Sequence, residues 1–159
     1  MKIAISSDTR SSLTDAVIEN LQIRGHDLLR YGALVESSDT ADPQHDASSQ
    51  ASDWPVCTAA AAHAVAAGEA DEGIVFCFTG TGASIAANKV DGIRAALVHD
   101  ATTAEGARVH NHANVLVMSI RATSETIAAE ILEAWFSTPW SKDDWNVRQV
   151  ARVDAMNQA

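Results

Sequence analysis

Short apolar runs alternate with longer amphipathic segments along almost the whole chain. A short apolar run is typical of a strand, whereas apolar residues spaced three and four apart are typical of one helix face. The short runs predict strands at residues 3–5, 27–31, 73–77, 93–98 and 114–118. The longer segments predict helices at residues 13–24, 58–67, 84–89, 102–109, 125–136 and 143–157.

This regular alternation predicts an α/β fold in which helices cover both faces of a parallel sheet. We expect residues 1–159 to form a single domain, because a chain of this length can bury one sizeable core. The polar segment 36–52 predicts an exposed loop with at most a short irregular turn. Ligands of such sheets bind beyond the carboxyl ends of the strands. That rule selects residues 6–9, 77–82, 99–100 and 119–121.

Composition narrows the class of partner. Hydrophobic residues make up 47% of the chain and charged residues 20%, which is ordinary for a soluble globular protein. The formal net charge of −10 disfavours nucleic acid and anionic membranes as partners, although a local arginine cluster could still hold a small anion. Two cysteines form no disulfide framework, and neither a signal peptide nor a membrane span is evident, so we expect a cytoplasmic protein.

The segment from Cys77 to Lys89 has the most specific pattern. A predicted strand ends in Cys77, a small-residue loop follows at 79–82, and a helix begins near Ser84. Such a unit directs backbone N–H groups and a helix dipole toward an anion, and the same field favours a thiolate. The alternative is purely structural: a buried cysteine and glycines that only shape a turn. The loop fits neither a Walker A motif nor a dinucleotide fingerprint.

Two further clusters have both a chemical and a structural interpretation. His110-Asn111-His112 could be a polar turn, an acid–base group or, with less support, part of a metal site, because no matching ligand spacing accompanies it. Arg148 and Arg152 share one face of the last predicted helix, where they could bind a phosphate or simply be solvated. Three tryptophans nearby favour packing or a subunit contact: Trp135, Trp140 and Trp145.

Several of these motifs occur in an order and spacing that resemble one family. The strongest is residues 73–89, where Ser-Ile-Ala-Ala-Asn-Lys follows a cysteine and a Thr-Gly loop, and the match continues to residue 95. The others are His110-Asn111, residues 114–116, Arg121, Asp53-Trp54-Pro55 in place of Asp-Tyr-Pro, and Arg148-x-x-x-Arg152. Together they resemble ribose-5-phosphate isomerase B and the galactose-6-phosphate isomerase subunits, over nearly the whole chain.

The resemblance implies a three-layer, Rossmann-like fold with a five-stranded parallel sheet. It also implies a homodimer or higher homo-oligomer with active sites at the subunit interface. The implied reaction interconverts aldose and ketose phosphates through an enediolate, without a metal or other cofactor.

Site residues follow from the same resemblance. It makes Cys77 the base that moves a proton between C1 and C2, with His110 and Asp8 opening the sugar ring. The enediolate oxygen would be held by the loop Thr79, Gly80, Thr81, Gly82, Ala83 and Ser84. Asn111 would bind hydroxyl groups, and the phosphate would be held by Arg148, Arg152 and Arg121.

The chain departs from the family pattern at the expected pocket. Thr9 and Val56 stand where histidines are expected, and Phe78 stands where a glycine is expected. Arg10 is a candidate replacement for the histidine missing at Thr9. We therefore expect a remodelled pocket and a pentose or tetrose phosphate as substrate, with a shorter or deoxygenated sugar preferred to ribose 5-phosphate. A catalytically silent sugar-phosphate-binding protein, a subunit of a hetero-oligomer and a flavodoxin-like nucleotide-binding module are the alternatives.

Overall fold

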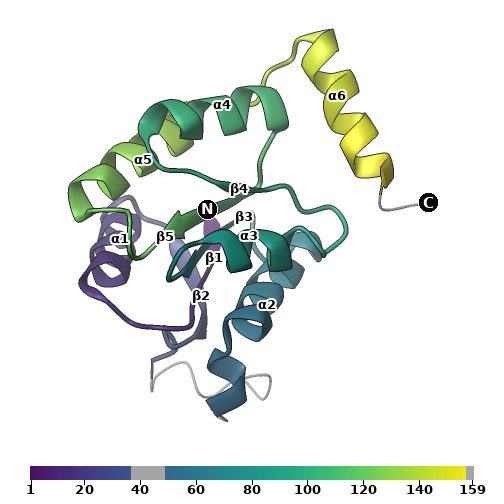
Figure 1. The fold of residues 1–159 in the computed structure, drawn as a ribbon. Coiled ribbons are helices and arrows are strands. Elements are labelled where there is room, and N and C mark those ends of the chain that lie inside the picture. Colours follow the sequence, from purple (N-terminus) through teal and green to yellow (C-terminus); the bar gives the residue numbers. More distant parts are fainter. Residues whose placement is uncertain (37–48, 157–159) are drawn as a thin grey trace.

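A single sheet of five strands lies at the centre of the fold (Figure 1). The computed structural model describes residues 1–36 and 49–156. The strand order is β2-β1-β3-β5-β4, and every pairing is parallel. The strands are β1 (Lys2–Ser7), β2 (Asp27–Gly32), β3 (Glu72–Cys77), β4 (Ala95–Leu97) and β5 (Val115–Ser119). The predicted α/β class, with its five-stranded parallel sheet, is confirmed.

Helices cover both faces of this sheet and make the fold three-layered. The helices are α1 (Ser12–Ile23), α2 (Trp54–Ala66), α3 (Thr81–Ala87), α4 (Ala101–Asn111), α5 (Glu125–Ser137) and α6 (Asp144–Ala155), with a 3-10 turn η1 (Ser49–Ser52) before α2. Buried side chains of α1, α4 and α5 form one core cluster. Those of α2 and α3 form a second cluster on the opposite face.

Alternation along each strand divides side chains between these two clusters. In β3, Ile74 and Phe76 belong to the α1/α4/α5 cluster, whereas Val75 and Cys77 belong to the α2/α3 cluster. Successive strand residues point to opposite faces, so this division follows from the period of two. Cys77 therefore points toward α2 and α3.

Some element boundaries differ from those the sequence predicts. Helix α2 begins at Trp54 instead of residue 58, because Pro55 in its first turn has a preset helical φ and needs no hydrogen-bond acceptor. Helix α3 begins at Thr81 instead of Ser84, directly after Gly80. Strand β4 is shorter than predicted, because the Arg94 N–H donates to the Asn114 side chain instead of the ladder. Of the predicted loop 36–52, residues 37–48 lie outside the described residues.

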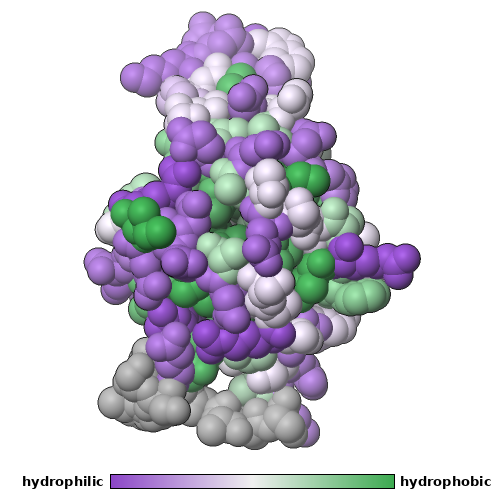
Figure 2. All heavy atoms as spheres, turned by 90° about the vertical axis from the view of Figure 1, so that its left-hand side faces the viewer, coloured by the Kyte–Doolittle hydropathy of each residue, from purple (hydrophilic) through white to green (hydrophobic). Residues whose placement is uncertain are grey.

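Helix α6 projects away from the three layers (Figure 1). Only Asn146 and Val150 of this helix are buried. On the face shown in Figure 2, apolar residues are interspersed among more numerous hydrophilic ones. No described helix has the length and apolar character that spanning a membrane requires.

Candidate active site

Cys77 is the last residue of β3 and lies at the carboxyl edge of the sheet. Its residue is 8% exposed, and its strand partner in β5 is Ser119. On the other side, Ser6 of β1 pairs with Val75 of β3, and Asp8 follows directly after the last residue of β1. The structure thus places a thiol and a carboxylate at adjacent strand ends.

The loop after Cys77 requires glycine at one position for two reasons. Gly80 has φ = 78°, and a Cβ atom there would lie 2.5 Å from Leu97 Cδ1. Its carbonyl accepts the Ser84 N–H at 3.0 Å, which closes the first turn of α3. The remaining N–H groups of this turn have no acceptor within the helix. Above the loop, Thr79 Oγ1 lies 2.8 Å from Thr81 Oγ1.

Trp54 covers the next glycine of the loop. A Cβ atom on Gly82 would lie 3.0 Å from the Trp54 ring, so the indole packs directly on the backbone of α3. Ala83 behind it is fully buried. The Asn88 side chain then ties α3 to β4, with Nδ2 donating to Ala95 O at 2.8 Å and Oδ1 accepting from Ala95 N at 2.9 Å. The sequence alone did not predict these structural roles of Trp54 and Asn88.

Phe78 lies at the rim of this site, where its residue is 59% exposed. Its carbonyl accepts the Ser119 hydroxyl and the Arg121 N–H, each at 3.0 Å. The Arg121 guanidinium lies over the Phe78 ring at 5.9 Å from the centroid. Arg121 has no carboxylate partner among the residues that the structure describes. A free cation therefore lies near the Cys77 loop, within reach of an anionic ligand.

The residues after β1 differ in whether their side chains already have a hydrogen-bond or ion-pair partner. Asp8 Oδ1 is buried and has no hydrogen-bond partner among the described residues. Arg10 Nε donates to Asp15 Oδ1 at 2.7 Å, so this arginine is already paired. Burial, with the nearby Asp8 carboxylate as a second cause, raises the pKa of the Cys57 thiol in α2 to about 11. Cys57 consequently stays protonated at neutral pH.

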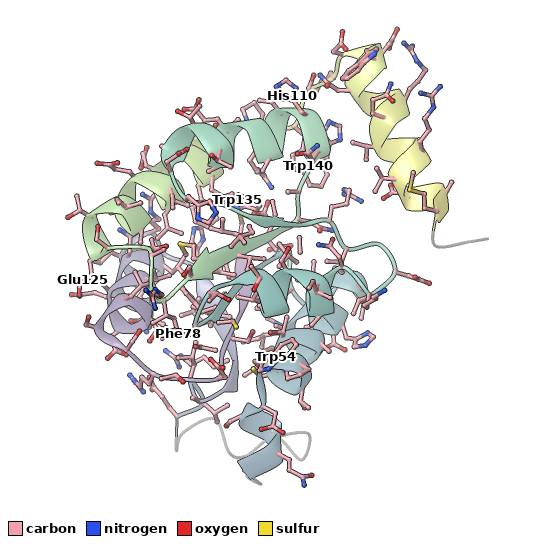
Figure 3. The ribbon with its side chains drawn as sticks, in the orientation of Figure 1. Trp54, Phe78, His110, Glu125, Trp135 and Trp140 are labelled. Atoms are coloured by element: carbon pink, nitrogen blue, oxygen red, sulfur yellow. The ribbon has the colours of Figure 1, made fainter. Side chains whose placement is uncertain are left out.

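The other predicted site residues lie at the opposite edge of the sheet. Helix α4 leaves the carboxyl end of β4 and returns to the amino end of β5, so His110 and Asn111 in its last turn lie at the amino edge. His110 Nδ1 lies 3.3 Å from Asn146 Oδ1 of α6. Figure 3 shows His110 beside α6 and Phe78 at the far end of the molecule.

Arg148 and Arg152 lie on the face of α6 opposite its buried residues. Both are exposed, and neither pairs with a carboxylate of residues 1–36 or 49–156. Arg152 donates to Gln149 Oε1 at 3.0 Å. A cleft of about 310 Å³ separates α6 from the sheet edge, and His110 and Asn111 are among its lining residues. One chain therefore does not bring the two groups of predicted site residues together.

No described cluster of three histidine, cysteine or acidic side chains is arranged to hold a metal ion. His112, the third residue of the His110-Asn111-His112 motif, is instead stacked on Trp140. The site chemistry of the described residues consists of a thiol, a carboxylate, backbone donors and free guanidinium groups.

Comparison with known proteins identifies the family. The sequence profile of the Ribose/Galactose Isomerase family matches residues 3–156. The chain belongs to this family. Its members named below are sugar-phosphate isomerases, so the resemblance found in the sequence is confirmed.

Individual members of the ribose/galactose isomerase family are similar over different lengths. Ribose-5-phosphate isomerase B of Escherichia coli is 42% identical over 109 residues, which are 69% of this chain and 70% of that protein. The D-erythrulose-4-phosphate isomerase of Pectobacterium atrosepticum is 33% identical over 136 residues, 85% of this chain and 82% of that protein. The alignments with curated relatives cover between 57% and 86% of those proteins' own length.

Solved structures of the ribose/galactose isomerase family extend the likeness to the complete fold. The structure of Clostridium thermocellum ribose-5-phosphate isomerase B matches with a TM-score of 0.82 and 30% identity. This match covers 99% of this chain and 98% of that one. The protruding α6 is therefore included in the shared architecture.

Proposed function

We propose that this protein interconverts an aldose phosphate and a ketose phosphate through an enediolate, with Cys77 as the proton-transfer base. The observation that carries the proposal is the placement of Cys77 at the carboxyl end of β3, immediately before the loop that Gly80 turns into α3. Family membership supports the reaction class, and the local geometry supports the choice of base.

The proposed chemistry needs only groups that the chain itself carries. The Cys77 thiolate removes the proton from C2 of the open aldose, while the C1 carbonyl oxygen becomes an enediolate oxygen. Donors of the loop 79–84 stabilise that oxygen, because preorganised N–H and O–H groups act where negative charge develops. Cys77 then returns the proton to C1, while the hydroxyl proton on O2 moves to O1 and the C2 oxygen becomes the ketose carbonyl. No electrons leave the substrate, so the step requires no cofactor.

A second copy of the chain would complete each site. The base and the loop lie at the carboxyl edge, whereas His110, Asn111, Arg148 and Arg152 lie at the amino edge and on α6. Exposed apolar residues of α6 and its C-cap support a partner there: Trp145, Val147, Val153 and Met156. Since this chain has both groups of residues, a homodimer would contain two equivalent sites and need no second kind of subunit.

Substrate length is the finer part of the proposal. We infer that a tetrose phosphate is preferred to ribose 5-phosphate. Thr9 and Val56 supply no imidazole, and the apolar ring of Phe78 stands at the rim, so a longer sugar has fewer polar partners. An unpaired buried hydroxyl costs about 1–3 kcal/mol. Similarity to a D-erythrulose-4-phosphate isomerase over 85% of this chain supports the shorter substrate.

Proton exchange tests the proposal directly. The protein is incubated in heavy water with tetrose, pentose and hexose phosphates, and deuterium at C1 or C2 is followed by NMR. We expect the fastest incorporation with a tetrose phosphate, and at least about a hundredfold slower incorporation in Cys77→Ala, the usual scale for a positioned base. Phosphate-sugar binding without any deuterium incorporation would favour the silent binding protein instead. Incorporation that survives Cys77→Ala would reject the assigned base.

A further inference from the structure

Few direct contacts hold α6 against the body. Its buried residues are Asn146 and Val150, and a cleft of about 310 Å³ lies between the helix and the sheet edge. A helix held so loosely takes its direction from the segment that precedes it. That segment, residues 138–143, contains Trp140, which packs against His112 and Arg108 of the body (Figure 3).

Four side chains form what we call the Trp140 clamp: Arg94, Arg108, His112 and Trp140. The Trp140 and His112 rings are stacked, with centroids 5.5 Å apart and planes at 1°. The guanidinium carbons of Arg108 and Arg94 lie 5.3 Å and 5.8 Å from the Trp140 centroid. Stacked rings and cations over an indole face are both favourable and directional.

Arg108 connects the clamp to buried residues of the core. Arg108 forms an ion pair with Glu72 at 2.9 Å and donates to Ala113 O at 2.8 Å. Trp135 Nε1 donates to the same carboxylate at 2.6 Å, and its ring lies 4.8 Å from the Arg108 guanidinium carbon. Burial raises the pKa of Glu72, although Arg108 and Trp135 both act against the shift. This paired, enclosed network gives Arg108 a fixed position under Trp140.

The clamp also reaches both groups of amino-edge site residues. Arg94 Nε donates to His112 O at 3.0 Å, and its Nη1 pairs with Asp154 of α6 at 2.9 Å. His112 has φ = 47°, a left-handed conformation that is unfavourable for a residue with a Cβ atom. It ends α4 directly after His110 and Asn111. Stacking on Trp140 stabilises this turn at the end of α4.

We infer that Trp140 is a positioning residue: by stacking on His112 between Arg94 and Arg108, it fixes the direction of α6 and thereby of Arg148 and Arg152. The inference rests on the proposed role of these arginines in phosphate binding. Trp140 itself touches no reacting atom. Its effect is on the fraction of molecules whose α6 is correctly oriented, and that fraction multiplies the apparent affinity for phosphate.

Two readouts test the positioning role in the full-length protein. The first is hydrogen exchange by mass spectrometry over residues 144–155, and the second is the affinity for inorganic phosphate by calorimetry. For Trp140→Ala we expect faster exchange confined to this segment and about three- to tenfold weaker phosphate binding, the scale of one aromatic pair. KM for the phosphorylated substrate should rise by a similar factor, with a smaller change in kcat.

Three further variants separate positioning from general stability. Trp140→Phe retains a stacked ring and should restore near wild-type exchange and affinity. Asp154→Asn breaks only the Arg94 link and should act in the same direction as Trp140→Ala, which keeps the test valid if Trp140→Ala fails to fold. Ile131→Val lowers core stability on α5 without touching the clamp, so it should leave both readouts unchanged.

Unchanged exchange in α6 together with unchanged phosphate affinity in Trp140→Ala would overturn the inference. Acceleration spread evenly over all segments would also overturn it, because that pattern indicates a stability effect alone. If the wild-type protein isomerises no sugar phosphate, the proposed function fails, but exchange and phosphate binding still decide the role of Trp140.

Discussion

Mixing two inactive variants should restore activity if each site combines residues from two copies. One variant is Cys77→Ala, which removes the proposed base, and the other is the double variant Arg148→Ala with Arg152→Ala. In a mixed dimer, one site lacks both functions, while the other receives intact Cys77 from one copy and intact arginines from the other. This expectation follows because, within one chain, Cys77 lies at the carboxyl end of β3, whereas the two arginines lie on α6, which projects from the other side of the fold.

The size of the recovery can be worked out in advance. Random pairing of equal amounts makes about half of the dimers mixed, each with one of its two sites intact, so about a quarter of wild-type activity should return. The Cys77→Ala parent should retain about 1% or less. Each lost arginine should weaken phosphate binding by about 1.5–3 kcal/mol, so the second parent is also nearly inactive at low substrate.

The assay mixes the variants, dissociates and refolds them together, and measures turnover with a tetrose phosphate. A matched control mixes wild-type chains with a triple variant that carries all three substitutions. Sites shared between copies predict about a quarter of full activity in this control, whereas sites within one chain predict about half. Failure of the two inactive variants to complement each other, with half activity in the control, would refute sharing between copies.

Three other outcomes follow from the same geometry. Arg148→Ala or Arg152→Ala should weaken turnover of phosphorylated sugars at low concentration and leave exchange with an unphosphorylated sugar nearly unchanged; equal losses for both would assign these arginines to assembly. His110→Ala should slow ribose 5-phosphate by about a hundredfold but a tetrose 4-phosphate much less, because a tetrose phosphorylated on O4 cannot close a furanose ring; equal slowing would contradict the ring-opening role. The free energy of unfolding should fall as the pH rises from about 9 to 11, since the raised pKa of Cys57 means that the unfolded chain loses this proton first. Chemical denaturation should show a loss of about 1 kcal/mol at pH 10 that Cys57→Ala abolishes, and an unaltered pH slope in that variant would exclude Cys57 as its source.

The local pattern of apolar and polar residues was sufficient to predict the sheet. It did not predict that the site residues are divided between the two edges of that sheet. Apolar runs identify strands because a buried parallel strand must be apolar on both faces, and all five appear where predicted. The carboxyl-edge rule likewise located Cys77 and Asp8. The direction of α4, which returns His110 to the other edge of the sheet, was not part of that local pattern.

Contacts between distant segments could not be predicted from the sequence at all. Arg10 was a candidate for the missing histidine, yet its pairing with Asp15 depends on how the chain enters α1. The stacking of Trp140 on His112 joins residues that no local periodicity relates. The tryptophans near the carboxyl end were assigned to packing or a subunit contact. For Trp135 and Trp140, packing within the chain is what the structure shows.

The spatial separation of Cys77 from the α6 arginines within one chain has a kinetic consequence under the proposed assembly. In a folded monomer the base and the phosphate-binding arginines would be too far apart to contact the same sugar phosphate. The monomer could therefore not remove the substrate's proton. Newly made chains would then remain inert until they meet. In dilute solution the turnover rate would rise with the square of the protein concentration, and it would become proportional to concentration only above the dissociation constant of the pair.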